Sequence, residues 1–78
     1  MSQNFDFEVQ ETAEERAARE GRLRAAEIAR RFAAIDRERI RPLAAIAAGT
    51  ATDEDRSRLT ALEQEATQLR AELAGLQN

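Results

Sequence analysis

The chain contains no cysteine, histidine, lysine, tyrosine or tryptophan, so many of the side chains that enzymes use for catalysis are missing. Without cysteine there are no disulfide bonds and no thiolate metal ligands. The two serines, Ser2 and Ser57, have no candidate base near them in the sequence. We therefore expect a protein that is not an enzyme, with no catalytic residue, no cofactor site and no metal site.

Large apolar side chains are also few. Alanine supplies 17 of the apolar residues, and beyond residue 9 only 12 larger apolar side chains remain. A chain of 78 residues buries only about 60% of the surface that it exposes when unfolded. We expect one domain whose core is too small for an independent monomer. The protein should therefore form a homo-oligomer or belong to a larger assembly.

Long hydrophobic runs are absent as well. The longest stretch without a charged residue, residues 42–52, has eleven residues. A helix needs about 20 predominantly apolar residues to span a bilayer. Asp6 and Glu8 stand where a secretory signal would carry basic residues. We expect neither membrane insertion nor a signal peptide.

Charge is divided into three segments. Residues 1–15 carry a net charge of −5, residues 16–41 carry +5, and residues 42–78 carry −3. All twelve basic residues are arginine, which pairs well with carboxylates and phosphates. The three segments can therefore neutralise one another within or between chains.

Residues 1–11 are predicted to form an extended N-terminal arm. Phe5, Phe7 and Val9 alternate with acidic residues, which is the periodicity of an extended strand. Exposed aromatic side chains often anchor contacts with partner proteins. We expect these three residues to dock onto a neighbouring chain.

Residues 12–78 are predicted to form a helical hairpin, which makes the fold class all-α. Thr12 stands three residues before Glu15, the spacing of a capping box, so the first helix should begin at Ala13. It should run to about residue 48, with a kink at 38–42, because Pro42 lacks a backbone N–H and crowds the preceding turn. Three glutamates precede arginines by four residues, which favours ion pairs along the helix: Glu15–Arg19, Glu20–Arg24 and Glu27–Arg31.

The second helix is predicted for about residues 53–74. Gly49 suits the left-handed residue that ends many helices. Thr52 precedes three acidic residues, as expected of an N-cap followed by a first helical turn. Gly75 should end the helix. Because the connection is so short, the two helices should lie antiparallel.

A heptad pattern runs along the second helix, and its apolar positions are Leu59, Leu62, Ala66, Leu69, Leu73 and Leu76. In a parallel pair of such helices, Arg58 would lie opposite Glu63 and Glu65 opposite Arg70, and both pairs would attract. In the alternative interpretation the same leucines face the first helix of their own chain. The sequence leaves both arrangements open.

The first helix carries an apolar stripe that includes Ala25, Ile28, Phe32 and Ile35, and across the kink Leu43 and Ile46. Arg39 falls inside this stripe. We expect its stem to lie along the stripe and its guanidinium to reach water, and the alternative is a carboxylate from the second helix or a partner. Since the first helix is longer than the second, residues 23–28 should be left uncovered by the hairpin. We expect Ile28, Phe32 and Ile35, like the leucines of the second helix, to bury surface against another copy of the chain or a larger partner protein.

Nine arginines within residues 16–41 suggest an alternative function, a regulatory or packaging protein that binds nucleic acid. These arginines are distributed around the whole helix, acidic residues alternate with them, and the chain is acidic overall. We therefore expect a solvated helix without nucleic acid as a partner.

Part of the sequence resembles short proteins encoded beside tail genes in phages and prophages. The resemblance covers residues 40–74 and is carried by Ile40–Leu43, by Ala47–Asp55 and by Leu59, Leu62, Leu69 and Leu73. It implies a helical hairpin and a role in tail assembly or as a small component of the virion. The expected location is thus the virion or the bacterial cytoplasm, and the expected partner is a second copy or a larger phage tail protein.

Overall fold

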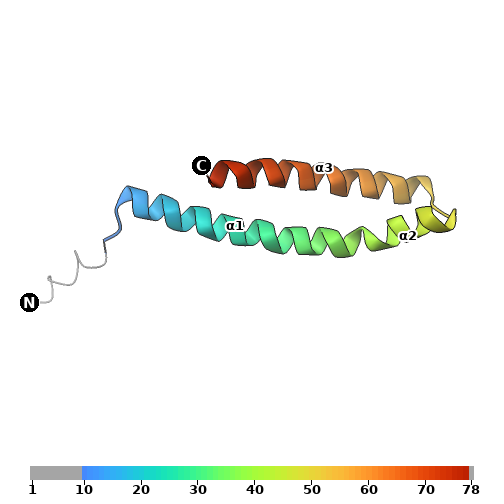
Figure 1. The fold of residues 1–78 in the computed structure, drawn as a ribbon, viewed down its shortest axis with the longest axis horizontal. Helices are drawn as coiled ribbons and strands as arrows, with labels where there is room; N and C mark the ends of the chain where they lie inside the picture. Colours follow the sequence, from blue (N-terminus) through green and yellow to red (C-terminus); the bar gives the residue numbers. More distant parts are fainter. Residues whose placement is uncertain (1–9, 78) are drawn as a thin grey trace, which may run out of the picture.

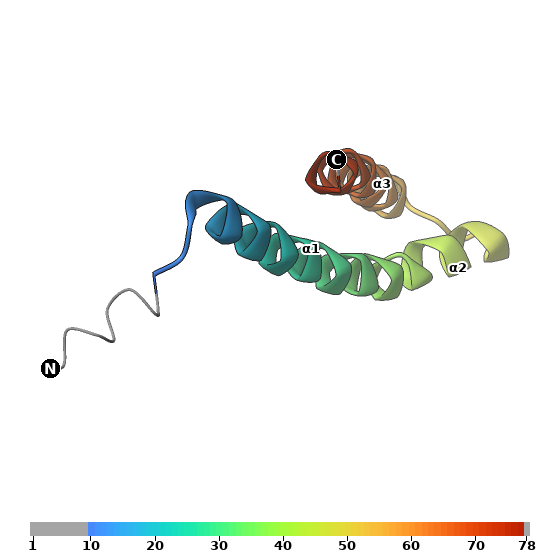
Figure 2. The ribbon, with the colours of Figure 1, turned by 60° about the vertical axis from the view of Figure 1, so that its left-hand side comes forward.

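The computed structural model describes residues 10–77, which form three helices and no strand. They are α1 (Ala13–Glu38), α2 (Ile40–Ala48) and α3 (Asp53–Leu76). α1 and α2 follow one another, and α3 runs back alongside both (Figures 1 and 2). The prediction of an all-α helical hairpin is confirmed. The predictions for Phe5, Phe7 and Val9 concern residues outside the described range.

The start of α1 is set by Thr12 and Glu15. The Thr12 Oγ1 atom accepts a hydrogen bond from the Glu15 backbone N–H at 3.0 Å, and the Thr12 N–H donates to Glu15 Oε1 at 2.8 Å. Each bond satisfies a backbone donor that the first helical turn leaves without a partner. The reciprocal capping box predicted from the spacing is present.

The first predicted helix is divided at Arg39, where α1 ends and α2 follows. Arg39 keeps right-handed helical dihedral angles, φ −82° and ψ −14°. Its N–H donates to the Ile35 carbonyl at 2.9 Å, and its carbonyl accepts from the Leu43 N–H at 3.1 Å. Pro42 has no N–H to offer the Glu38 carbonyl. The helical hydrogen bonding therefore continues on both sides of this one missing donor.

The chain reverses at Gly49, which has a φ of 75°. The Thr50 N–H donates to the Ala45 carbonyl at 2.8 Å, which closes the end of α2. Thr52 and Asp55 then form a second capping box, with hydrogen bonds of 2.9 and 3.1 Å. α3 continues through Gly75 to Leu76, beyond the predicted end, since Gly75 does not have the positive φ of a helix-ending glycine.

The core is a single seam between α1 and α3. Its buried residues are Ile28, Ile35, Leu62, Ala66 and Leu69, and the half-buried Phe32 and Leu73 pack against it. Ala66 occupies a heptad position that is otherwise filled by leucine, so the seam contains less apolar side-chain volume at this point. The hairpin thus has one apolar interface, and each helix has a long outward face.

Candidate interaction surfaces

A ladder of three ion pairs runs along one side of the seam. Arg24 pairs with Glu72, Arg31 with Glu65, and Arg58 with Glu38. The α1 members are seven residues apart in ascending order, and the α3 members are seven residues apart in descending order. This is the register of an antiparallel coiled coil with charged residues flanking the apolar positions.

The rungs of the ladder are well-formed hydrogen-bonded pairs. Arg24 Nη2 donates to Glu72 Oε1 at 2.9 Å, and Arg31 Nη2 donates to Glu65 Oε1 at 2.7 Å. Arg31 Nη1 also reaches Glu38 Oε2 at 2.9 Å, which links the second and third rungs. These hydrogen bonds hold the pKa values of the Glu65 and Glu72 carboxyls below the usual range. The glutamates therefore remain charged to lower pH than isolated carboxyls would.

The ladder replaces two patterns predicted from the sequence. The charges assigned to a parallel partner are used inside one chain, since Arg58 pairs with Glu38 and Glu65 pairs with Arg31. None of the three predicted pairs four residues apart on the first helix is among the ion pairs of residues 10–77. The arginines of α1 that face α3 bind its carboxylates instead.

Arg39, at the junction of α1 and α2, forms a further ion pair with α3, on the side of the seam opposite the ladder. Its Nη1 lies 3.1 Å from Glu63 Oε2, and its Nη2 lies 3.4 Å from Asp36 Oδ1. The side chain retains 27% of its exposure, and its buried Nε has no hydrogen-bond partner. The preferred prediction, a guanidinium in water, is wrong, because α3 places a carboxylate within reach.

Most residues predicted to contact another chain lie within this chain's own seam. Ile28, Ile35, Leu62 and Leu69 are buried there, whereas Phe32, Leu59 and Leu73 are half-buried. The leucines of α3 therefore face α1, which is the second of the two arrangements that the sequence left open.

At the open end of the hairpin the prediction of an uncovered segment holds for part of residues 23–28, where Leu23, Ala26 and Glu27 are exposed. Leu76 is 38% exposed and Leu23 is 56% exposed, but Ile28 is completely buried. The expectation that residues 23–28 are uncovered is thus correct for Leu23 and wrong for Ile28. The reason is that α3 extends far enough along α1 to cover Ile28.

An apolar surface lies on the outside of α2, and it includes Leu43, which the sequence placed with Ile46 on the stripe of Ile28 and Ile35 but which the structure leaves exposed. We call it the α2 apolar face, and it consists of Ile40, Leu43, Ala44 and Ala47, all exposed. Ile40 is 63% exposed and Leu43 is 45% exposed. Pro42 and Ala45 occupy the side of α2 that is turned inward, where they are buried and half-buried. In the sequence, the uncharged stretch from residue 42 to 52 indicated an apolar segment here. It did not indicate which of its residues face α3 and which face outward, and the structure does.

Four arginines form a stripe along the outer side of α1 and α2. We call it the arginine stripe, and it consists of Arg22, Arg30, Arg37 and Arg41. All four are exposed, and within residues 10–77 no carboxylate lies at ion-pair distance from them. Spacings of eight, seven and four residues keep them on one helical face. The sequence indicated arginines all around the helix, but the tertiary structure neutralises those on the inner side.

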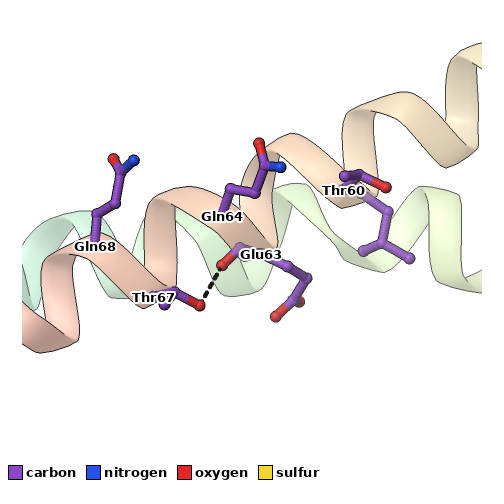
Figure 3. A pocket seen from close by; sticks show the side chains of 6 residues that line it. Thr60, Glu63, Gln64, Thr67 and Gln68 are labelled. Atoms are coloured by element: carbon purple, nitrogen blue, oxygen red, sulfur yellow. Dashed lines mark hydrogen bonds between the residues drawn. The ribbon is translucent and has the colours of Figure 1, made fainter.

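A hollow in the surface of α3 is open to solvent. Figure 3 shows its lining side chains, which all project from α3. They are Leu59, Thr60, Glu63, Gln64, Thr67 and Gln68. The Thr67 hydroxyl donates to the Glu63 backbone carbonyl at 3.0 Å, and the Glu63 carboxylate is held by Arg39. Because one helix supplies the whole lining, the hollow has no opposing wall that could enclose a small molecule.

In comparisons with known proteins, no protein-family model, curated protein or solved structure matches the chain. Within residues 10–77 no three histidine, cysteine, aspartate or glutamate side chains gather as metal ligands. No helix in this part of the chain has the length and apolar character required to cross a bilayer.

Proposed function

We propose that this protein is a non-enzymatic structural or assembly protein that acts through helix–helix contacts. Its partners are a second copy of the chain, a larger phage tail protein, or both. It is a small phage tail- or virion-associated component or a tail assembly factor. The phage assignment is supported by the sequence resemblance over residues 40–74, which spans α2, the turn and most of α3.

The observation that carries the proposal is the contrast between a small core and an exposed apolar face. Within residues 10–77 only Pro42 and five seam-forming apolar residues are buried, whereas Leu23, Ile40, Leu43, Ile46 and Leu76 remain exposed. Three of these lie on the short helix α2, which is apolar except for Arg41. Exposed apolar residues that cluster on one element, unlike scattered ones, mark interaction surfaces.

The contact residues are those left exposed by the seam. Replacing Leu62 and Leu69 with aspartate would place two charges in the core of the hairpin and unfold it. Because the variant would be unfolded, it would lose self-association whichever surface of the folded protein forms the contact. The informative substitutions are therefore on the α2 apolar face.

The first experiment measures self-association of the full chain by sedimentation equilibrium. We expect the wild-type protein to form oligomers and the Ile40→Asp/Leu43→Asp variant to be a monomer with unchanged helical circular dichroism. Leu23→Asp is the matched control, because Leu23 is equally exposed but lies outside the α2 apolar face. A folded wild-type monomer at high concentration that mass spectrometry finds neither in purified phage particles nor in tail assembly intermediates would refute the proposal.

A second candidate function is supported by the arginine stripe. Its four arginines extend over about 28 Å of helix at about 1.5 Å per residue, a length that can contact several phosphates of a nucleic acid. The test is a titration against duplex DNA at two salt concentrations. Phosphate contacts predict a steep loss of affinity with salt, and Arg30→Ala/Arg37→Ala should make that dependence shallower. Affinity that does not change with salt would exclude this function.

A further inference from the structure

We propose that the α2 apolar face, together with Arg37 and Arg41, binds the N-terminal arm of a second copy of this chain. The arm is defined here as residues 1–9. This inference rests on the self-association proposed above and identifies the two surfaces that meet. Three observations support it: the chemistry of the α2 apolar face, the sequence of the arm, and the length of helix that separates the arm from that face in one chain.

The receiving surface combines apolar side chains with cationic neighbours. Ile40 and Leu43 supply most of the apolar area, and the small Ala44 and Ala47 leave room beside them. Arg37 precedes Ile40 by three residues and Ala44 by seven, so it lies on the same helical side, and Arg41 lies beside Ile40. Both arginines are exposed members of the arginine stripe. The surface therefore suits a ligand that alternates apolar and acidic groups.

The arm has that alternation. Phe5, Phe7 and Val9 are separated by Asp6 and Glu8. In an extended segment the first three would project to one side and the two acidic residues to the other. The apolar side can cover Ile40 and Leu43 while the carboxylates lie at the edge, where arginine side chains can reach them. Phenylalanine is among the aromatic residues that are enriched in the buried part of protein–protein interfaces.

The arm cannot reach this surface within its own chain. The start of α1 and the α2–α3 turn lie at opposite ends of the molecule (Figure 1). The helical path from Ala13 to Ile40 is about 40 Å at about 1.5 Å per residue. A fully extended segment from Ala13 back to Phe5 covers at most about 28 Å. An occupant with this sequence must therefore come from another copy.

Charge supports the same pairing. Residues 1–15 carry −5 and residues 16–41 carry +5. The arginines of α1 that face α3 are already neutralised by its glutamates. Those of the stripe have no carboxylate at ion-pair distance within residues 10–77, so they are available to the acidic residues of another chain.

A charge exchange between two variants tests the inference. Variant A carries Arg37→Glu/Arg41→Glu, and variant B carries Asp6→Arg/Glu8→Arg. Each variant alone juxtaposes like charges, so we expect its self-association to weaken by about tenfold or more. An equimolar mixture restores opposite charges in both directions and should regain wild-type association by sedimentation equilibrium. Arg22→Glu/Arg30→Glu is the control, with the same change of charge away from the α2 apolar face.

The outcomes separate this inference from the proposed function. If the wild type associates but A and B associate equally well, or if their mixture fails to recover, the arm does not bind at this face and only this inference is wrong. If the wild type is a monomer, the proposed self-association is also wrong. If A loses affinity for duplex DNA while its self-association is unchanged, the arginines serve nucleic acid and the arm proposal is overturned.

Discussion

Arg39 illustrates at the residue scale how a single side chain can contradict the pattern in which it stands. It occupies an apolar position of the seam, and its two terminal nitrogens bind Asp36 and Glu63. Its Nε is buried without a partner, which costs free energy because the desolvated donor has lost its hydrogen bond to water. The arginine therefore combines a favourable ion pair with an unsatisfied group.

Replacing Arg39 with methionine should stabilise the hairpin. The change removes the unsatisfied Nε and keeps an apolar stem, so the free energy of unfolding should rise by about 1 kcal/mol in urea titrations. Glu63 and Asp36 are half-exposed or more and remain hydrated without the arginine. Arg37→Met on the outer side is the control and should change little. A lower stability of the Arg39 variant would mean that the ion pair outweighs the unsatisfied donor.

Ile28 represents the opposite case, an apolar residue that is completely buried in the seam. Ile28→Ala should lower the free energy of unfolding by about 2–5 kcal/mol, because it removes buried surface and leaves a cavity. Leu23→Ala, in the same helix but exposed, should change it by less than about 0.5 kcal/mol. Thermal unfolding followed by circular dichroism compares the two. Equal effects would show that α3 does not cover Ile28.

At the scale of the elements, local sequence signals specify where the helices start and where the chain turns. Two capping boxes and one left-handed glycine bracket the helices, and each depends on residues no more than a few positions apart. The ion pairs behave differently. Four of them join a residue of α3 to a residue far from it in sequence, and Arg24 and Arg31, which were predicted to pair along the first helix, bind Glu72 and Glu65 of α3.

Two glycine substitutions should have opposite signs. Gly49→Ala should destabilise the hairpin by about 1 kcal/mol, since its φ of 75° is costly for any residue with a Cβ atom. Gly21→Ala should stabilise it by about 0.5–1 kcal/mol, because Gly21 is inside α1 and an added Cβ meets no atom within 4 Å. Thermal melts of the two variants test both signs. Destabilisation by Gly21→Ala would mean that another chain packs closely against that glycine.

The ladder predicts how stability depends on pH. The folded-state pKa values of Glu65 and Glu72 lie below the ordinary value of 4.5, so their contribution is complete above that pH and is lost as the pH falls through the folded-state values. Glu65→Gln/Glu72→Gln should therefore melt at a lower temperature than wild type at neutral pH. This difference should shrink as the pH falls through the folded-state pKa values of the two carboxyls and vanish once both are protonated. A constant difference would indicate an effect of helix propensity instead of charge.

At the scale of the whole molecule, the hairpin is one seam with two outward sides, and within residues 10–77 the helices bury only six residues. Such a molecule has little stability to spare, because the buried apolar surface of a short chain barely offsets the entropy of ordering it. Association would add a second interface. The arginine stripe and the α2 apolar face show where that interface can form.

If association supports the fold, the melting temperature should depend on protein concentration. Mass action stabilises the associated form, so the wild-type melting temperature should rise with concentration across about two orders of magnitude. The Ile40→Asp/Leu43→Asp variant should melt at one temperature throughout. Calorimetry at several concentrations makes the comparison. A wild type that melts independently of concentration would establish that a single chain maintains the fold.

The sequence alone was sufficient for the helical class, the capping box at Thr12, the N-cap at Thr52, the turn at Gly49 and the antiparallel hairpin, because each follows from residues close together in the chain. Only the tertiary structure decided which partner each charged or apolar side chain meets. The heptad of α3 is equally suited to its own α1 and to another chain, and the arginines of α1 look alike until α3 covers one side. Once the seam forms, it buries the leucines predicted to bind a partner and leaves Ile40, Leu43 and the arginine stripe exposed. The periodicity of a helix defines its faces, but which face is covered depends on contacts between residues far apart in sequence.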